Sequence, residues 1–376
     1  VGWVERSEPH QRRWRGQAGN ADGFGACEHA PYRRGMTLIE LLVVITIIVI
    51  VLGAALPALQ PALEGRAVRE AARSVSVYLG SARNRALETG RPCGVVLMRA
   101  IEEGGCDRLS QVEIPPPYAG DTVESTVRVQ ATGTVGQVNL TFWNTGTGAA
   151  EAISVWDDST KVGLVNNGDL IQINFQGPYY RLGGLTAPTS TTATGTIAAT
   201  LVSQGQTLPW STSTQSDPLP YRILRGPQTG SAQPMQLPVG TVIDLEFSER
   251  DSLSYPLADS PDKPRLWCIM FSPNGAVEGM YRRDENDSPP TVSAPLRVTE
   301  PVYLLVGRRD RLKSLPHEDG LYNWQDLNNL WVAVHPQTGL VSVAEVAKED
   351  PTEPNYSKRV RMSRDFARTA QSMGGR

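Results

Sequence analysis

The sequence predicts an α+β protein, with a long N-terminal transmembrane α-helix packed on a mostly antiparallel β-sheet head that carries a large loop-rich insertion. Three observations predict this fold. An apolar run beginning at Leu38 is long enough to cross a membrane. Helical periodicity continues beyond it as far as Ala86. Short runs of β-branched and aromatic residues, separated by Gly, Pro, Ser and Thr, then fill most of the chain.

The apolar run from Leu38 to Leu56 contains nineteen residues and one ionisable group, Glu40. A helix needs about 20 residues to cross the hydrocarbon of a bilayer, so we expect a transmembrane helix over residues 36–59. The first 34 residues carry six arginines against four acidic residues, and such positive charge favours the cytoplasmic side. We therefore expect a cytoplasmic N-terminus and a head on the opposite side of the membrane.

A secretory signal peptide is the competing interpretation, but its apolar region usually has only about 7 to 15 residues and does not readily tolerate a carboxylate near its start. Glu40 therefore argues against a signal peptide. A carboxylate in the bilayer costs about 2.5 to 3.5 kcal/mol on insertion scales, which indicates a partner. Cleavage between Gly35 and Met36 would expose an α-amino group four residues before Glu40. Between staggered helices the two opposite charges would set the axial register. The alternative is an acid that extends to the lipid headgroups.

Beyond the apolar run, a stripe of small and apolar residues predicts that the helix continues over residues 60–90 as an amphipathic stalk. The stripe consists of Leu63, Ala67, Ala71, Val75, Leu79, Ala82 and Ala86. Gly90 and Pro92 form a typical helix stop. Pro57 lacks a backbone donor, and we expect it to kink the helix near the membrane surface.

A β-rich head is predicted over residues 91–347, with an insertion over about 130–235. Within the insertion, residues 183–220 are rich in Thr, Ser, Gly and Pro and are expected to form a long exposed loop. Residues 348–376 are polar and are expected to form a mobile tail, with a short helix over 363–373 as the alternative. The expected strands are Cys93–Met98, Thr126–Val129, Val138–Trp143, Leu170–Phe175, Tyr221–Leu224, Thr241–Phe247, Trp267–Phe271, Val302–Val306, Leu330–Val334 and Leu340–Ala344.

The sequence carries no P-loop, G-x-S-x-G elbow, H-E-x-x-H motif or Rossmann fingerprint, so no enzyme activity, catalytic residue or cofactor is predicted. His317 and His335 each adjoin a proline, which suits turns better than a positioned base. Asp284, Glu285 and Asp287 lack the spacing of a calcium loop, so no metal site is predicted. The net charge of -3 provides no broad basic surface, and nucleic acid is not an expected partner.

Cleavage after residue 35 would leave three cysteines, Cys93, Cys106 and Cys268. None belongs to a C-x-x-C pair, which argues against structural zinc. Two alternatives stay open for them. A disulfide between Cys93 and Cys106 would close a small loop and contribute about 3 kcal/mol in an oxidising compartment, or the cysteines are buried thiols.

The segment from Arg33 to Val44 resembles the prepilin cleavage and methylation motif, in which a glycine precedes the cut and a glutamate is the fifth residue after it. Met36 stands at the first mature position, where the family most often has phenylalanine. The resemblance implies a leader over residues 1–35 that ends at Gly35 and is removed by a prepilin peptidase. It also implies N-methylation of Met36 and a role for Glu40 in assembly.

Further segments extend this resemblance beyond the anchor. Pro57 is the twenty-second residue after the cut, where helices of the family commonly carry a kinking proline. Glu70–Val96, Cys268–Gly279 and Trp331–Val343 are similar to parts of minor pseudopilin H of type II secretion and of fimbrial minor pilins. The resemblance is specific over residues 33–96, patchy over 238–346 and absent over most of 130–235.

The family implies a structural role as a minor pseudopilin in a periplasmic pilus-like filament of type II secretion. The protein would cross the inner membrane once, with its head in the periplasm. Its partners would be the prepilin peptidase and methylase, other pseudopilins, the inner-membrane assembly platform and secreted cargo. One alternative is a minor pilin of a type IV pilus or DNA-uptake system. Another, from a different class, is a membrane-tethered periplasmic enzyme or binding module.

Overall fold

The structure is a computed structural model, and it describes residues 37–99, 104–151, 153–154, 164–183, 192–193, 196–202, 208–230, 232–249, 265–284, 291–292, 296–312 and 321–372. The chain divides into two compact units, Val1–Pro57 and Ala58–Arg376. The boundary falls inside one continuous helix of 52 residues, α1 (Leu38–Thr89). Gly90 follows the helix with φ of 64°, and its N–H donates to the carbonyl of Ala86. The predicted helix stop is therefore confirmed.

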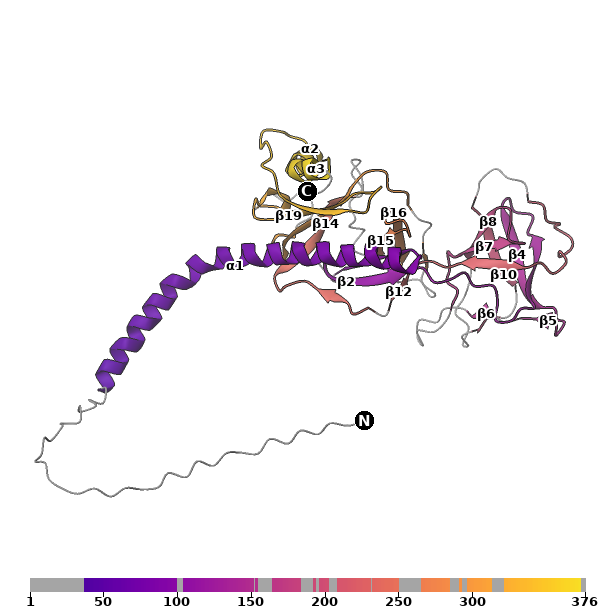
Figure 1. Cartoon of the computed structure of the whole chain (residues 1–376), viewed down its shortest axis with the longest axis horizontal. Helices are drawn as coiled ribbons and strands as arrows, with labels where there is room; N and C mark the ends of the chain where they lie inside the picture. The colour runs from indigo at the N-terminus through magenta and orange to yellow at the C-terminus, as the bar shows by residue number, and fades with distance from the viewer. Residues whose placement is uncertain are drawn as a thin grey trace, which may run out of the picture. The chain divides into compact units, whose positions relative to one another are not determined.

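An eleven-stranded sheet forms the larger sheet of the second unit (Figure 1). Its strands are β1 (Cys93–Arg99), β2 (Gly105–Glu113), β12 (Gln228–Thr229), β13 (Met235–Gln236), β14 (Thr241–Glu249), β15 (Arg265–Phe271), β16 (Val277–Asp284), β17 (Thr291–Val292), β18 (Val302–Arg308), β19 (Leu330–Val334) and β20 (Val341–Glu345). Their order is β17-β16-β15-β1-β2-β14-β18-β19-β20, and β12 and β13 also pair with β2. Every described pairing is antiparallel, as expected.

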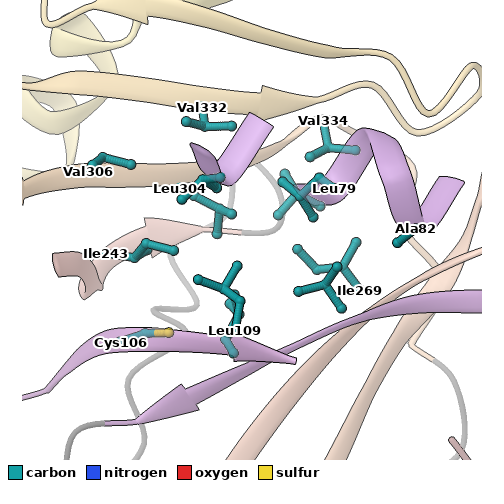
Figure 2. Close-up of a cluster of buried hydrophobic side chains, with 14 of the residues drawn as sticks. Leu79, Ala82, Cys106, Leu109, Ile243, Ile269, Leu304, Val306, Val332 and Val334 are labelled. Carbon is teal, nitrogen blue, oxygen red and sulfur yellow. The ribbon is translucent and has the colours of Figure 1, made fainter. Parts of the chain in front are cut away.

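The second half of α1 packs on one face of this sheet. Ala71, Val75 and Leu79 have no exposed surface, which confirms the predicted apolar stripe from Ala71 to Ala86; Ala67 is half-buried, and the side chain of Leu63 lies outside the described part of the chain. Figure 2 shows Leu79 and Ala82 among side chains of the sheet, including Ile269 and others from β18 and β19. The alanines among these residues are small, so the helix backbone can lie close to the strands. The helix carries five arginines between Arg66 and Arg85, yet one of its faces is apolar and buried from Val68 to Ala86.

Two short helices, α2 (Tyr356–Ser363) and α3 (Asp365–Ser372), cover the opposite face of β18 and β19 (Figure 1). Val360 and Ala367 pack there against alternate residues of these strands. Gln371 donates to the carbonyl of Ala333 at 2.8 Å and to the hydroxyl of Ser342 at 2.6 Å. The expectation of a mobile tail is therefore wrong for residues 356–372. Strands that are apolar on both faces require a second cover, and these helices provide it.

The insertion folds as a second, seven-stranded antiparallel sheet. Its strands are β3 (Ser125–Ala131), β4 (Gln137–Asn144), β5 (Ala149–Ala150), β7 (Leu170–Ile173), β8 (Tyr179–Gly183), β10 (Thr196–Leu201) and β11 (Tyr221–Leu224), in the order β11-β7-β8-β10-β4-β3 with β5 beside β4. A separate pair joins β6 (Ile153–Ser154) to β9 (Thr192–Ala193). The seven-stranded sheet has its own core, in which the Phe142 and Tyr221 rings meet edge to face with centroids 5.0 Å apart.

Most expected strands are present, with small shifts at their ends. Three differences have physical causes. The strand expected over Leu170–Phe175 ends at Ile173, because Asn174 and Phe175 adopt left-handed φ values of 54° and 53°. The long loop expected over residues 183–220 contains β10, which pairs with both β4 and β8. The sequence analysis also missed β2, because its polar and charged residues do not show the apolar pattern of a strand. It is a strand because it pairs with β1.

Arg83 of α1 holds two turns of the head together. Its Nε–H is shared between the carbonyls of Gly275, at 3.1 Å, and Thr338, at 2.9 Å. The turns approach so closely that a Cβ atom on Gly339 would lie 2.0 Å from the Gly275 carbonyl oxygen. Both glycines also have positive φ, 84° at Gly275 and 62° at Gly339. Arg83 therefore connects the hairpin of β15 and β16, and that of β19 and β20, to the helix.

We expect Arg83→Met to lower the free energy of unfolding by about 1.5 to 3 kcal/mol, because methionine keeps the aliphatic contacts but leaves two carbonyls without their charged donor. Urea denaturation of the full chain in detergent measures the change. Arg73→Met is the matched control, since Arg73 is exposed on the same helix and should lose less than about 0.5 kcal/mol. Equal losses in the two variants would show that Arg83 does not hold the turns.

Asp169 connects two neighbouring strands, β7 and β11, at one edge of the inserted sheet. Its carboxylate accepts hydrogen bonds from the Asn166 N–H at 2.8 Å, just before β7, and from the Gly226 N–H at 2.9 Å, just after β11. Only 2% of its surface is exposed, and burial raises the pKa of Asp169 to about 7, against the two hydrogen bonds and the positive charge of Arg225. The folded chain therefore binds this proton more tightly than the unfolded chain does.

Because the pKa of Asp169 is raised in the folded chain, the protein is expected to lose stability as the pH rises from acidic to neutral. The contribution is fully present below the ordinary Asp pKa of 3.8 and is lost as the pH rises toward about 7. In wild type this titration should lower the free energy of unfolding by on the order of 2 kcal/mol between pH 5 and 7.5, and Asp169→Asn should remove that decrease. Urea denaturation across this pH range measures the difference. Asp217→Asn, at an exposed position of the same insertion, should keep the wild-type slope. A parallel pH profile for Asp169→Asn and wild type would contradict the prediction.

Candidate functional site

The first turn of α1 is capped by Thr37. Its hydroxyl oxygen accepts a hydrogen bond from the Glu40 N–H at 3.3 Å, and its carbonyl accepts one from the Leu41 N–H at 3.1 Å. Thr37 and Glu40 thus have the spacing of a capping box, which is a sequence signal for the helix start that the sequence analysis did not use. A carboxylate in the first turn also interacts favourably with the helix dipole, by about 0.3 to 1 kcal/mol.

The helix that follows presents an apolar surface on every side. Thirteen large apolar side chains between Leu38 and Leu52 are exposed, from 40% at Val44 to 83% at Leu38. The hydroxyl of Thr46 donates to the carbonyl of Leu42 at 2.8 Å, so it needs no outside partner. A helix that is apolar all round belongs in a lipid or protein environment, and Glu40 is the one ionisable residue of this segment.

The predicted site residues have different outcomes. Glu40 lies in the first turn of α1 and is exposed. The helix is continuous through Pro57, and the kink expected there stays a prediction. Gly35, Met36 and the rest of the leader lie outside the described residues. Among the helices within the described residues, none reaches the length and mean hydropathy of a membrane span.

A family comparison bears directly on this segment. The model of the prokaryotic N-terminal methylation motif matches residues 31–56, which include the predicted cut, Glu40 and most of the apolar run. The chain is type IV pilin-like. Its architecture agrees, since α1 packs on a large antiparallel sheet. The comparison with curated proteins finds no match, and neither does the comparison with solved structures.

The methylation motif implies that a prepilin peptidase processes this pilin-like chain and that its N-terminal helix anchors it to a membrane. Pilin-like proteins are generally structural subunits without enzyme activity. His335 lies in the turn after β19, as the sequence analysis expected. The Nδ1 atom of His335 accepts a hydrogen bond from the Thr338 N–H at 3.4 Å. His317 lies outside the described residues.

The acidic cluster falls largely outside the described part of the chain. Asp284 ends β16, and neither Glu285 nor Asp287 is among the described residues. In the part of the chain that the structure describes, no three His, Cys, Asp or Glu side chains come together as metal ligands.

The cysteines of the pilin-like head are buried thiols. Cys93, Cys106 and Cys268 are all buried, and none of them forms a disulfide. In the pairing of β1 with β2, Cys93 lies opposite Glu113 and Cys106 lies opposite Arg99. The two cysteines are thus about six strand positions apart, roughly 20 Å, far beyond the reach of a disulfide. Burial raises the pKa of the Cys106 thiol to about 12, so it stays protonated and unreactive.

Proposed function

We propose that the chain is a minor pseudopilin, a structural subunit of a periplasmic pilus-like filament in type II protein secretion. The observation that supports this best is the apolar surface around residues 38–52, which bears Glu40 in its first turn and lies inside the methylation motif. In this proposal a prepilin peptidase removes the leader, residues 1–35, by cutting between Gly35 and Met36. The same machinery methylates the new amine of Met36, and the chain has no enzyme activity of its own.

Before assembly, residues 36–59 would cross the inner membrane once. The N-terminus would lie on the cytoplasmic side, and the head would lie in the periplasm. The cut places a positive amine next to the positive end of the α1 dipole, which is unfavourable without a nearby anion. Glu40 supplies that anion from the first turn. Two unit charges 4 Å apart attract by about 4 kcal/mol at an effective dielectric constant of 20, which exceeds the cost of inserting the carboxylate.

In the filament, the apolar surface of one α1 would pack on those of other subunits, and Glu40 would pair with the Met36 amine of a neighbour. Apolar packing alone permits axial sliding, whereas a charge pair at one depth selects a single register. The head would then contact other pseudopilins, the assembly platform of the inner membrane and secreted cargo. The inserted sheet provides additional surface for such contacts because it folds around its own core.

Two alternatives make different predictions. A minor pilin of a type IV pilus or DNA-uptake system would be processed in the same way and would differ in the filament that it joins. A membrane-tethered enzyme or binding module would use α1 only as an anchor. For such a tether, processing after Gly35 and the charge at Glu40 would have no effect on the activity of the head.

Mass spectrometry of the mature N-terminus tests the proposal in a host with an active prepilin peptidase. The expected chain begins at Met36 and is heavier than the unmodified form by one methyl group. In a matched strain without the peptidase, the chain should keep its leader. An end near Ala55 or Ala58 would indicate signal-peptidase cleavage, and an end upstream of Gly35 would remove the amine on which the proposal depends.

A further inference from the structure

The C-terminal helices form a recess with residues at the start of β18. Its volume is about 470 Å³, within the range of ligand-binding pockets. Its lining combines Arg361 of α2, Arg364 between the two helices and Arg368 of α3 with side chains from the sheet. The other lining residues are Glu300, Pro301, Tyr303, His335, Gln371 and Ser372. Arginines thus outnumber carboxylates three to one around the recess.

The three guanidinium groups differ in how firmly they are held. Arg364 is 2% exposed, lies over the rings of Tyr303 at 5.3 Å and Trp331 at 4.8 Å, and donates to the Phe247 carbonyl at 3.1 Å. It forms a fixed positive floor. Arg361 of α2 and Arg368 of α3 are exposed and line the recess at its rim.

The rim arginines are available to a ligand. Arg368 contacts Asp365 at 3.6 Å, but both side chains are more than half exposed, and such an ion pair contributes little in water. Among the described residues, Arg361 has no ion-pair partner. Burial raises the pKa of Tyr303; Arg364 and Arg368 act to lower it, and Glu300 acts to raise it, so all three charges act on this ring inside the recess.

The shape and charge of the recess favour a carboxylate over a polyphosphate. Guanidinium groups hold carboxylates through paired hydrogen bonds, and a recess of this size admits one or two side chains. A nucleic acid requires cations spread along a phosphate backbone, whereas these three lie around one recess with Glu300 among them. Pro301 and Tyr303 also offer apolar walls for the stem of a glutamate.

We propose that this arginine recess binds acidic side chains of a partner protein, with Arg361 and Arg368 as the recognising groups and Arg364 as the fixed floor. The site lies on the head, and its operation does not require leader processing. It adds to the proposed function a defined surface on which a partner carrying a cluster of glutamates or aspartates docks.

Fluorescence anisotropy with the full chain in detergent tests this proposal. The probe is a labelled glutamate-rich peptide, and its control is the same peptide with every glutamate replaced by glutamine. We expect the double variant Arg361→Gln, Arg368→Gln to lose affinity by about tenfold or more, since each truncated charged hydrogen bond weakens binding. Lys358→Gln removes an exposed charge of the same helix outside the recess and should change affinity less than about twofold.

Equal binding of the two peptides, or unchanged affinity in the double variant, would overturn the proposal. So would tighter binding of a single-stranded oligonucleotide that is lost in the same double variant, because the recess would then select polyanions. Circular dichroism establishes that the double variant is folded, and Arg361→Lys with Arg368→Lys should bind with intermediate affinity. A Glu40→Ala chain should bind the peptide normally, which separates this result from the fate of the pseudopilin proposal.

Discussion

Glu40→Ala should insert into the membrane and lose its leader, yet assemble at least tenfold less than wild type. Alanine removes the carboxylate that would pair with the Met36 amine of a neighbour, and the loss of about 4 kcal/mol of attraction at each contact repeats along a filament. Apolar packing would remain, but no single register would be selected. Co-purification of other filament subunits with the detergent-extracted chain measures assembly, and the size of the processed chain measures cleavage.

A second substitution separates charge from helix capping. Glutamine also satisfies a capping box, so Glu40→Gln keeps the local structure at Thr37 while removing the charge. We expect Glu40→Gln to fail in assembly as Glu40→Ala does, and the exposed control Glu88→Ala to assemble normally. Normal assembly of the glutamine variant would assign Glu40 to capping alone. Unchanged or improved insertion with a fully active head in both variants would favour a simple tether.

Leu79→Ala should lower the free energy of unfolding by about 3 to 5 kcal/mol. Leu79 has no exposed surface and faces the sheet, where Figure 2 shows it near Val334, with Leu304 and Ile269 in the same cluster. Truncation removes apolar contacts and leaves a cavity that the rigid strands cannot fill. Urea denaturation monitored by tryptophan fluorescence measures the loss, because Trp267 lies in the same core.

The matched control for this prediction lies two residues earlier on the same helix. Val77 is 64% exposed, so Val77→Ala should change the free energy of unfolding by less than about 1 kcal/mol. Similar losses at positions 77 and 79 would show that α1 does not pack on the sheet through the Leu79 side. Loss of helix content without loss of the sheet would lead to the same conclusion.

The helix and its boundaries followed from local chemistry. The apolar stripe, the capping pair Thr37 and Glu40, and the stop at Gly90 each act within a few residues, so they can be recognised without knowledge of the fold. The methylation motif is local in the same way, and its match over residues 31–56 supports the interpretation of the anchor.

The strands were predicted less completely. Those with continuous apolar runs, such as β18 and β19, were found because they are buried on both faces. In contrast, β2 carries the polar residues Asp107, Arg108 and Gln111 at partly or fully exposed positions, and it is a strand because β1 pairs with it from Cys106 to Glu113. A pairing partner that lies elsewhere in the chain leaves no signal in the segment itself.

The arginine recess and the Arg83 contact depend on distant parts of the chain. Arg83 meets carbonyls 192 and 255 residues away, and Arg364 lies against Tyr303 and Trp331 of the sheet. In the sequence, residues 348–376 are polar, which is why they were expected to be mobile. The apolar second face of the sheet reverses that expectation, because it provides the contacts that order α2 and α3.

The sequence by itself determined the N-terminal helix of this protein, namely an apolar first part with one acid in its first turn, a methylation motif at its start and a defined end. Those features depend on hydrophobicity, charge and spacing over short distances. Only the tertiary structure decided that the insertion is a separate sheet, that Cys93 and Cys106 lie too far apart to bond and that the C-terminal helices gather arginines into a recess. Such outcomes depend on strand register and packing between segments far apart in the chain, which no local pattern specifies.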